Sequence, residues 1–247
     1  MLEGLPTALS GVAEDCVEFR RLLDLQGYVL LAGQGTSAQQ LVKTAEMVGD
    51  VDLLIEESLS GPTVMELRHD PVRGRSASEA AYFTCDAFPQ HTDMAYVECP
   101  PRYLLMQCVR QSPNQGGTTL LAHCDAARDR LSKDELAALT EPVYRFKFPP
   151  GCPECSSRSF SVVHQVDRHI CFRFKRSAMS FPPSARGPVE AFDEALTANV
   201  LAHLLLPGEI LVIDNHRVTH GRTSFVDTAG SRRHLRRTYA RERENGS

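Results

Sequence analysis

The spacing of apolar and polar positions changes along the chain, from helical periods near the start to short strand-like runs beyond residue 80. A stripe of apolar residues predicts a helix over about residues 14–26 that ends at Gly27. The apolar run 28–32 predicts a short buried strand. Ser37-Ala-Gln-Gln40 has the form of a capping box and predicts a second helix, which ends at Gly49.

Most later segments have the length and composition of short strands, with few helices between them. Helices are expected at about residues 132–140 and 189–204, and a hairpin turn at 166–169. Strands are expected at 63–68, 103–110, 143–148, 161–164, 169–174, 209–213 and 234–240. This pattern predicts a mainly β fold with flanking helices, of the double-sheet jelly-roll type.

The length of 247 residues favours a single domain over residues 1–247. Within it we expect an N-terminal extension over about 1–80 and a jelly-roll core over about 81–243. The polar segment 71–79 is a candidate active-site lid, and it equally fits an uninvolved surface loop.

Composition narrows the class of protein. With 42% hydrophobic and 23% charged residues the chain has the make-up of an ordinary soluble domain, and its net charge of −4 argues against nucleic-acid binding. No apolar run reaches the roughly 18 residues that would span a membrane. The start has no secretory signal and the eight cysteines are scattered, which favours reduced thiols and a cytoplasmic location.

A candidate metal site is formed by His91-Thr-Asp93 together with His220, which we expect just past the end of a strand. Residues at i and i+2 of an extended segment point to the same side, so His91 and Asp93 can chelate one ion. Two histidines and one carboxylate are the facial triad of non-haem Fe(II) oxygenases. Asp214, Asn215 and Arg222 are candidates for hydrogen bonds that fix the segment bearing His220.

A rival triplet, His123-Cys-Asp125, begins a segment that resembles a helix more than a strand. On a helix, residues i and i+2 do not face each other, and Asp125 is a natural N-cap. We therefore prefer the pair His91 and Asp93.

A basic run follows at residues 232–237. If it is a strand, Arg233 and Arg237 share a face with Leu235 and Tyr239, and two inward guanidiniums would clamp a carboxylate. The run fits a solvated basic tail equally well. The hydroxyl of Thr119, after the turn Gly116-Gly117, could donate to the same carboxylate.

Several segments, in their order along the chain, resemble the Fe(II)/2-oxoglutarate oxygenases of the taurine dioxygenase and γ-butyrobetaine hydroxylase (clavaminate synthase-like) family. The resemblance covers about residues 80–243. It rests on Phe88-Pro-Gln-His-Thr-Asp93, Cys99-Pro-Pro-Arg-Tyr-Leu-Leu-Met-Gln-Cys108, Gly116-Gly-Thr-Thr119, Leu206-Pro-Gly-Glu-Ile-Leu-Val-Ile-Asp-Asn215, Arg217-Val-Thr-His-Gly-Arg222 and Arg233-His-Leu235.

The resemblance implies a double-stranded β-helix in which His91, Asp93 and His220 hold iron, and Arg233 and Thr119 bind the distal carboxylate of 2-oxoglutarate. It implies that O2 is consumed, that succinate and CO2 are released, and that a small polar molecule is hydroxylated. An amino acid or a natural-product intermediate would fit. Substrate-binding candidates are Arg237, which matches a substrate-facing position, together with Tyr96, Met94, Glu66 and Arg68.

Three alternatives remain open at this stage. Gly33-x-Gly35-x-x-Ala38, with Asp52 and Glu56 further on, fits a dinucleotide-binding turn and a nicotinamide-dependent oxidoreductase. Cys152-Pro-Glu-Cys155 is half of a zinc-binding module. A metal-binding jelly roll of the cupin type would need no clamp for 2-oxoglutarate.

Overall fold

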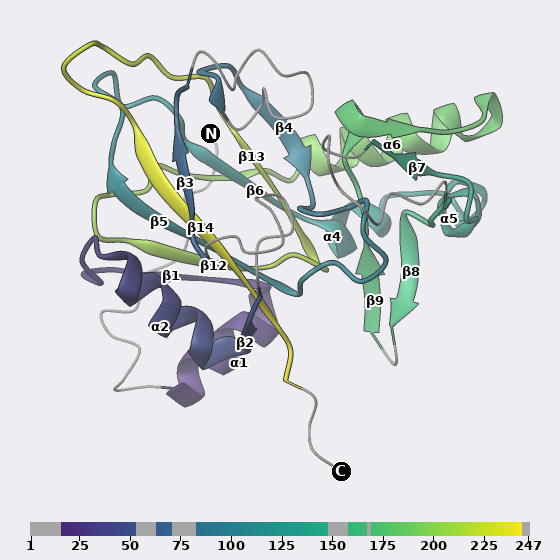
Figure 1. The fold of residues 1–247 in the computed structure, drawn as a ribbon. Helices are drawn as coiled ribbons and strands as arrows, with labels where there is room; N and C mark the ends of the chain where they lie inside the picture. Colours follow the sequence, from purple (N-terminus) through teal and green to yellow (C-terminus); the bar gives the residue numbers. More distant parts are fainter. Residues whose placement is uncertain (1–15, 53–62, 71–82, 148–157, 167–168, 244–247) are drawn as a thin grey trace.

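The computed structural model describes residues 16–52, 63–70, 83–147, 158–166 and 169–243. This part of the chain is mostly β-structure, arranged as two main sheets with helices outside them (Figure 1). The predicted mainly β fold with flanking helices is confirmed. The candidate lid at 71–79 lies outside the described residues, as do Cys152 and Cys155. Within the described residues, no helix has both the length and the apolar character needed to cross a bilayer.

The larger sheet joins the N-terminal strands to strands from the middle and the end of the chain. Its order is β1-β12-β5-β14-β2, with β3 also paired to β14, and the pairings are antiparallel. Its members are β1 (Tyr28–Leu31), β2 (Asp50–Val51), β3 (Met65–Arg68), β5 (Tyr103–Arg110), β12 (Ile210–Asp214) and β14 (His234–Arg241).

The smaller sheet contains three of the candidate site residues, His91, Thr119 and His220. Its order is β11-β6-β13-β4, again antiparallel. Its members are β4 (Phe88–His91), β6 (Thr119–His123), β11 (Leu201–His203) and β13 (Val218–Arg222). Two short ladders complete the β-structure, formed by β7 (Arg145–Phe146) with β10 (Met179–Ser180) and by β8 (Val163–Val166) with β9 (His169–Phe172).

Both faces of the larger sheet are buried, and this explains its continuous apolar strands. Along β1, Val29 and Leu31 pack with the helices α1 (Cys16–Gln26) and α2 (Ala38–Val48), whereas Leu30 faces the main core. Alternation along a strand sends successive side chains to opposite faces. In Figure 1 the two helices lie together along one side of this sheet.

The remaining helices gather beside the smaller sheet. They are α4 (Cys124–Arg128), α5 (Lys133–Thr140) and α6 (Arg186–Thr197), with the 3-10 turns η3 (Arg176–Ala178) and η4 (Pro183–Ala185) before α6. Helix α6 packs against α4 and α5, and its buried Phe192 contacts Phe172 and Phe174. Helix α5 begins with a capping box formed by Ser132 and Glu135.

Several boundaries differ from the sequence predictions. The helix expected at 189–204 ends at Thr197, because residues 201–203 pair with β6 as β11. The strand expected at 143–148 is reduced to Arg145–Phe146. The first residue of α4 is Cys124, so Asp125 lies inside its first turn and pairs with Arg128 instead of capping the helix. At Ser37 only half of a capping box forms: its side chain accepts from the Gln40 N–H, whereas the Gln40 side chain donates to Gln34.

The dinucleotide-binding alternative is not supported. The turn with Gly33 and Gly35, both at positive φ, does connect β1 to α2. However, β1 pairs antiparallel with β12, and a dinucleotide-binding unit requires a parallel sheet.

Candidate metal centre and active site

The pairing of β13 with β4 brings His220 beside His91. The two residues are direct partners in the ladder, and their rings lie 4.2 Å apart between centroids. Gly221 permits this close approach, because a Cβ there would lie 2.8 Å from the carbonyl oxygen of Phe88. His220 is the third residue of β13, so the prediction that it follows a strand end is wrong. The segment Val218–Arg222 forms a strand despite its polar residues, because it pairs with β6 on one side and β4 on the other.

Asp93 completes the cluster two residues after the end of β4. His91 Nε2 lies 3.3 Å from Asp93 Oδ1, and His220 Nε2 lies 3.7 Å from Asp93 Oδ2. One ligand atom from each of the three residues lies within 4.8 Å of the others, and all three side chains are buried. The structure therefore assembles the predicted triplet from segments 129 positions apart, 220 − 91.

The hydrogen bonds of this cluster leave lone pairs facing each other. His91 Nδ1 lies 2.9 Å from the Pro89 carbonyl oxygen, which can only accept, so Nδ1 carries the proton. His91 Nε2 consequently presents a lone pair to Asp93 Oδ1, and neither atom has a hydrogen-bond partner despite burial. Two buried acceptors in contact repel each other unless a cation lies between them. The donor set fits a divalent transition metal.

The second carboxylate oxygen of Asp93, Oδ2, accepts hydrogen bonds from other side chains of the protein. Arg237 Nη1 and the Tyr239 hydroxyl each donate to Oδ2 at 2.9 Å, both from β14 of the other sheet. The Asn215 side chain holds the backbone of Asp93: its Oδ1 accepts from the Asp93 N–H at 2.7 Å, and its Nδ2 donates to the Asp93 carbonyl at 3.1 Å. The carboxylate is thus fixed with Oδ1 directed at His91.

The electrostatics favour the protonation states that a metal needs. Burial, together with the adjacent His91, lowers the pKa of His220 to about 3, although Asp93 opposes this shift. Burial also lowers the pKa of His91, although Asp93 opposes this shift. Burial raises the pKa of Asp93, but Arg237 and the histidines outweigh it and hold this pKa well below its ordinary value. At neutral pH the site offers two neutral imidazoles and one carboxylate, as metal ligation requires.

A second buried guanidinium lies next to the triplet. Arg233, directly before β14, is only 7% exposed and donates to the Gly117 carbonyl at 3.1 Å. Its guanidinium lies 5.1 Å from the Phe225 ring centroid, and no carboxylate of the described chain forms an ion pair with it. Burial lowers the pKa of Arg233 to about 10. The alternative of a solvated tail is wrong for this residue.

The backbone around Arg233 is fitted closely to its side chain. Gly117 has φ +77°, and a Cβ there would lie 2.6 Å from Arg233 Nε. The turn predicted at Gly116-Gly117 therefore makes room for the guanidinium. Thr119, the first residue of β6, is buried nearby.

A cavity of about 50 Å³ connects the histidines to the arginines. It is lined by five residues predicted as ligands or substrate contacts, by Arg222, and by five further residues. The predicted members are His91, Thr119, His220, Arg233 and Arg237, and Arg222 had been expected only to support them. The additional members are Leu67, Phe88, Met106, Gly221 and Leu235. Strand alternation had placed Leu235 on the same face as the two arginines, although it was not assigned to a site.

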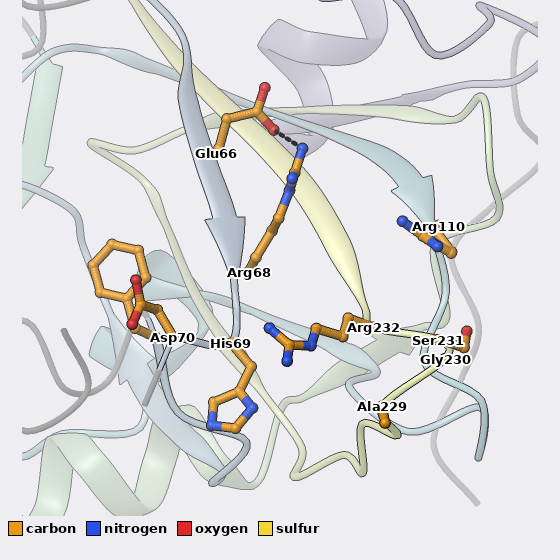
Figure 2. A pocket seen from close by; sticks show the side chains of 10 residues that line it. Glu66, Arg68, His69, Asp70, Arg110, Ala229, Gly230, Ser231 and Arg232 are labelled. Carbon is orange, nitrogen blue, oxygen red and sulfur yellow. Dashed lines mark hydrogen bonds and ion pairs between the residues drawn. The ribbon is translucent and has the colours of Figure 1, made fainter. Parts of the chain in front are cut away.

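Four predicted substrate contacts do not line this cavity. Glu66 and Arg68 are exposed because β3 turns Leu67 inward instead. Together with Arg110 and Arg232 they line a larger open pocket of about 650 Å³, whose charged wall is seen in Figure 2. Met94 (φ +53°) and Tyr96 are buried in the core beyond the end of β4. Their contact with a substrate stays a prediction.

The predicted supporting residues hold neighbouring segments in place. Asp214 accepts from Arg102 at 3.3 Å and from the His216 N–H at 3.1 Å, which fixes the turn before β13. Arg222 Nη2 donates to the carbonyls of Thr84 and Asp86 at 3.0 and 2.7 Å. Burial lowers the pKa of Arg222 to about 10.

Comparison with known proteins identifies the family of this chain. The sequence model of the "Taurine catabolism dioxygenase TauD, TfdA family" matches residues 9–239. The chain therefore belongs to the TauD/TfdA family, and the resemblance stated from the sequence is confirmed.

Relatives include enzymes that act on amino acids. The chain is 27% identical over 157 residues to L-asparagine oxygenase of Streptomyces coelicolor. The matched region covers 60% of this chain and 46% of that protein. It is 28% identical over 168 residues to clavaminate synthase 2 of Streptomyces clavuligerus, covering 63% and 50%. To 3-((Z)-2-isocyanoethenyl)-1H-indole synthase of Fischerella ambigua it is 26% identical, covering 64% of each. The matches thus span roughly half to two thirds of these relatives.

Solved structures show the same fold. Asparagine oxygenase in complex with Fe(II), 3-hydroxyasparagine and succinate superposes with a TM-score of 0.79 at 21% identity, over 94% of this chain and 79% of the other. The non-haem iron oxygenase OrfP with iron and α-ketoglutaric acid gives 0.76 at 18% identity, over 94% and 80%.

The depressed histidine pKa predicts a pH-dependent stability. Unfolded His220 takes up a proton near its ordinary value of 6.5, but folded His220 only near 3, so the metal-free protein loses stability as pH falls below about 6.5. His220 accounts for about 2 kcal/mol of the loss between pH 7 and 5. In urea unfolding, His220→Gln should lose about 2 kcal/mol less than wild type over this interval, and the exposed-site control His169→Gln should match wild type. An unchanged pH slope in His220→Gln would contradict this assignment.

Proposed function

We propose that the chain is an Fe(II)/2-oxoglutarate-dependent dioxygenase that oxidises a small, carboxylate-bearing molecule, with an amino acid as the first candidate. The observation that carries the proposal is the buried contact between His91 Nε2 and Asp93 Oδ1, two acceptors that lack hydrogen-bond partners. A cation bound to both atoms removes their repulsion. Membership of the TauD/TfdA family supports the choice of iron.

In this proposal the fold is a single-domain double-stranded β-helix. Its support is that antiparallel strands of two sheets face each other across one core, which contains Leu104 and Leu211 of the larger sheet and Leu121 of the smaller. Strands β1 and β3 of the expected N-terminal extension pair within the larger sheet, so they belong to the same unit. A cytoplasmic location stays a prediction from the sequence.

His91 Nε2, Asp93 Oδ1 and His220 would hold the iron, and three protein ligands leave coordination positions open. When bound, the iron supplies the activation of O2 that oxidises the substrate. The protein supplies the positions of the reactants. Arg237 and Tyr239 keep Asp93 Oδ2 engaged, and Asn215 fixes the Asp93 backbone, so the carboxylate cannot rotate away.

Arg233 and Thr119 would bind the distal carboxylate of 2-oxoglutarate. A buried guanidinium without an acidic partner is costly, and a carboxylate entering this cavity would offset the cost with charge-assisted hydrogen bonds. The Gly117 carbonyl orients the guanidinium from one side and Phe225 packs against it. This anion site distinguishes the proposal from a cupin-type metal protein.

The substrate class rests on two supports. Relatives are named L-asparagine oxygenase, L-lysine 3-hydroxylase and L-ornithine/L-arginine 3-hydroxylase. In addition, Arg237 lines the cavity beside the triplet, at a position that the family resemblance gives as substrate-facing. Hydroxylation, with release of succinate and CO2, is the outcome we propose.

The direct test is succinate release by the purified chain with Fe(II), 2-oxoglutarate, O2 and each common L-amino acid. Turnover should require Fe(II) and fall by more than about 100-fold in Asp93→Ala, because a metal ligand contributes at least as much as the residues that support it. The control Asp134→Ala, an exposed acid on α5, should behave as wild type. Wild-type turnover in Asp93→Ala would refute the metal centre. Binding of Fe(II) and 2-oxoglutarate without turnover of any amino acid would refute only the substrate class.

The co-substrate site makes a separate prediction. Arg233→Ala should raise the KM for 2-oxoglutarate by about 10- to 100-fold, because a charged hydrogen bond to a buried carboxylate is lost. Arg233→Lys should recover only part of this loss, since a lysine keeps the charge without the planar fork. The neighbouring exposed Arg232→Ala is the matched control and should leave the KM unchanged. An unaltered KM in Arg233→Ala would place the carboxylate elsewhere.

A further inference from the structure

A second group of potential metal ligands lies outside the triplet. His69, Cys85 and Asp227 each offer one ligand atom, and these atoms lie within 4.8 Å of one another. They come from three segments: His69 follows β3, Cys85 precedes β4, and Asp227 lies between β13 and β14. All three are partly buried, so water can reach the group.

Backbone hydrogen bonds fasten these three segments to one another. The Asp70 N–H donates to the Phe83 carbonyl at 3.0 Å, which joins the segment of His69 to that of Cys85. The Phe225 N–H donates to the Cys85 carbonyl at 2.9 Å, which joins the segment of Cys85 to that of Asp227. The ligand atoms are thus brought together by the main chain, and their proximity does not depend on long flexible side chains.

The two carboxylate oxygens of Asp227 have different surroundings, as those of Asp93 do. Its Oδ1 accepts from the Arg233 N–H at 2.7 Å, and its Oδ2 is buried without a hydrogen-bond partner. An unsatisfied buried carboxylate oxygen is costly, and a cation would satisfy it. The unpartnered Oδ2 of Asp227 therefore points to a bound cation, independently of the proximity of the three ligand atoms.

We propose that His69, Cys85 and Asp227 form a second divalent-metal site, of the zinc-preferring kind, that ties these three segments together. Imidazole nitrogen, thiolate sulfur and carboxylate oxygen all bind Zn²⁺, at about 2.0–2.3 Å. The sulfur ligand discriminates against Mg²⁺ and Ca²⁺, which bind oxygen. Three protein ligands leave the fourth position to water.

A metal at this site would stabilise the segments that hold two arginines of the active-site cavity. Arg222 donates to the carbonyls of Thr84 and Asp86, on either side of Cys85. Asp227 holds the backbone of Arg233. A cation bound there would therefore hold the supports of two cavity arginines, whether or not the cavity binds 2-oxoglutarate.

A redox switch at Cys85 is a weaker explanation. Burial, with the carboxylate of Asp227, raises the pKa of the Cys85 thiol, whereas reactive cysteines have lowered values. The described chain also places no second cysteine in this group of ligands.

Cobalt titration of the whole protein tests the site, because Co²⁺ bound to a thiolate gives an intense near-ultraviolet charge-transfer band. The triplet at His91 contains no sulfur and cannot produce this band. We expect about one equivalent of band-forming Co²⁺ in wild type, displaced by Zn²⁺, and loss of the band in Cys85→Ser. Asp227→Asn keeps the acceptor for Arg233 but loses the charge, and should weaken the binding at least 10-fold.

Two controls separate this site from other thiols. Cys99→Ser removes an exposed cysteine elsewhere, and the double variant Cys152→Ser/Cys155→Ser removes the Cys-x-x-Cys pair. Both should keep the wild-type band and affinity. No band in wild type, a band that persists in Cys85→Ser, or a band lost in the double variant would overturn the proposal. If Cys85→Ser does not fold by circular dichroism, Asp227→Asn decides: unchanged Co²⁺ affinity there overturns it as well.

Discussion

The Asp93 carboxylate is the point on which the two sheets converge. Its Oδ2 accepts from Arg237 and Tyr239 of the larger sheet, whereas its Oδ1 faces His91 at the end of β4 in the smaller sheet. A charge this deeply buried is tolerable only if both oxygens are compensated. The protein compensates one of them, and the other is left for a cation. The electrostatics of this arrangement therefore favour a cation at Oδ1, which is the role that we propose for the metal.

Strand register determines which side chains surround Asp93. Pairing of β13 with β4 sets His220 opposite His91, and Gly221 lets the two strands approach at that point. On β14, alternation sends Arg237 and Tyr239 to the same buried face as Leu235, with Arg233 just before the strand. The Arg237 guanidinium thus stabilises the Asp93 carboxylate. The Arg233 guanidinium, four residues earlier in the chain, is the one that we propose binds a carboxylate from outside. The two candidate sites are neighbours because Arg237, which holds Asp93, and Arg233 belong to the same segment of the chain.

The sequence predicted the parts whose signals are local. The spacing of His91 and Asp93, and of Arg233 and Arg237, made these residues candidates. The family resemblance then assigned their roles. Asn215 was identified only as a support, since its contact with the Asp93 backbone spans 122 positions. Glu66 and Arg68 were misplaced relative to the cavity because the direction in which β3 faces depends on its pairing with β14. The group of His69, Cys85 and Asp227 has no sequence spacing that would reveal it.

The most direct test of the account is an anaerobic crystal structure with stoichiometric Fe(II), in which anomalous scattering locates the iron. We predict an anomalous peak between the two sheets from an iron bound to His91 Nε2, Asp93 Oδ1 and His220, with Arg237 and Tyr239 still donating to Asp93 Oδ2. A structure without iron between these three side chains, or with Asp93 bound to the metal through the oxygen that Arg237 holds, would contradict it.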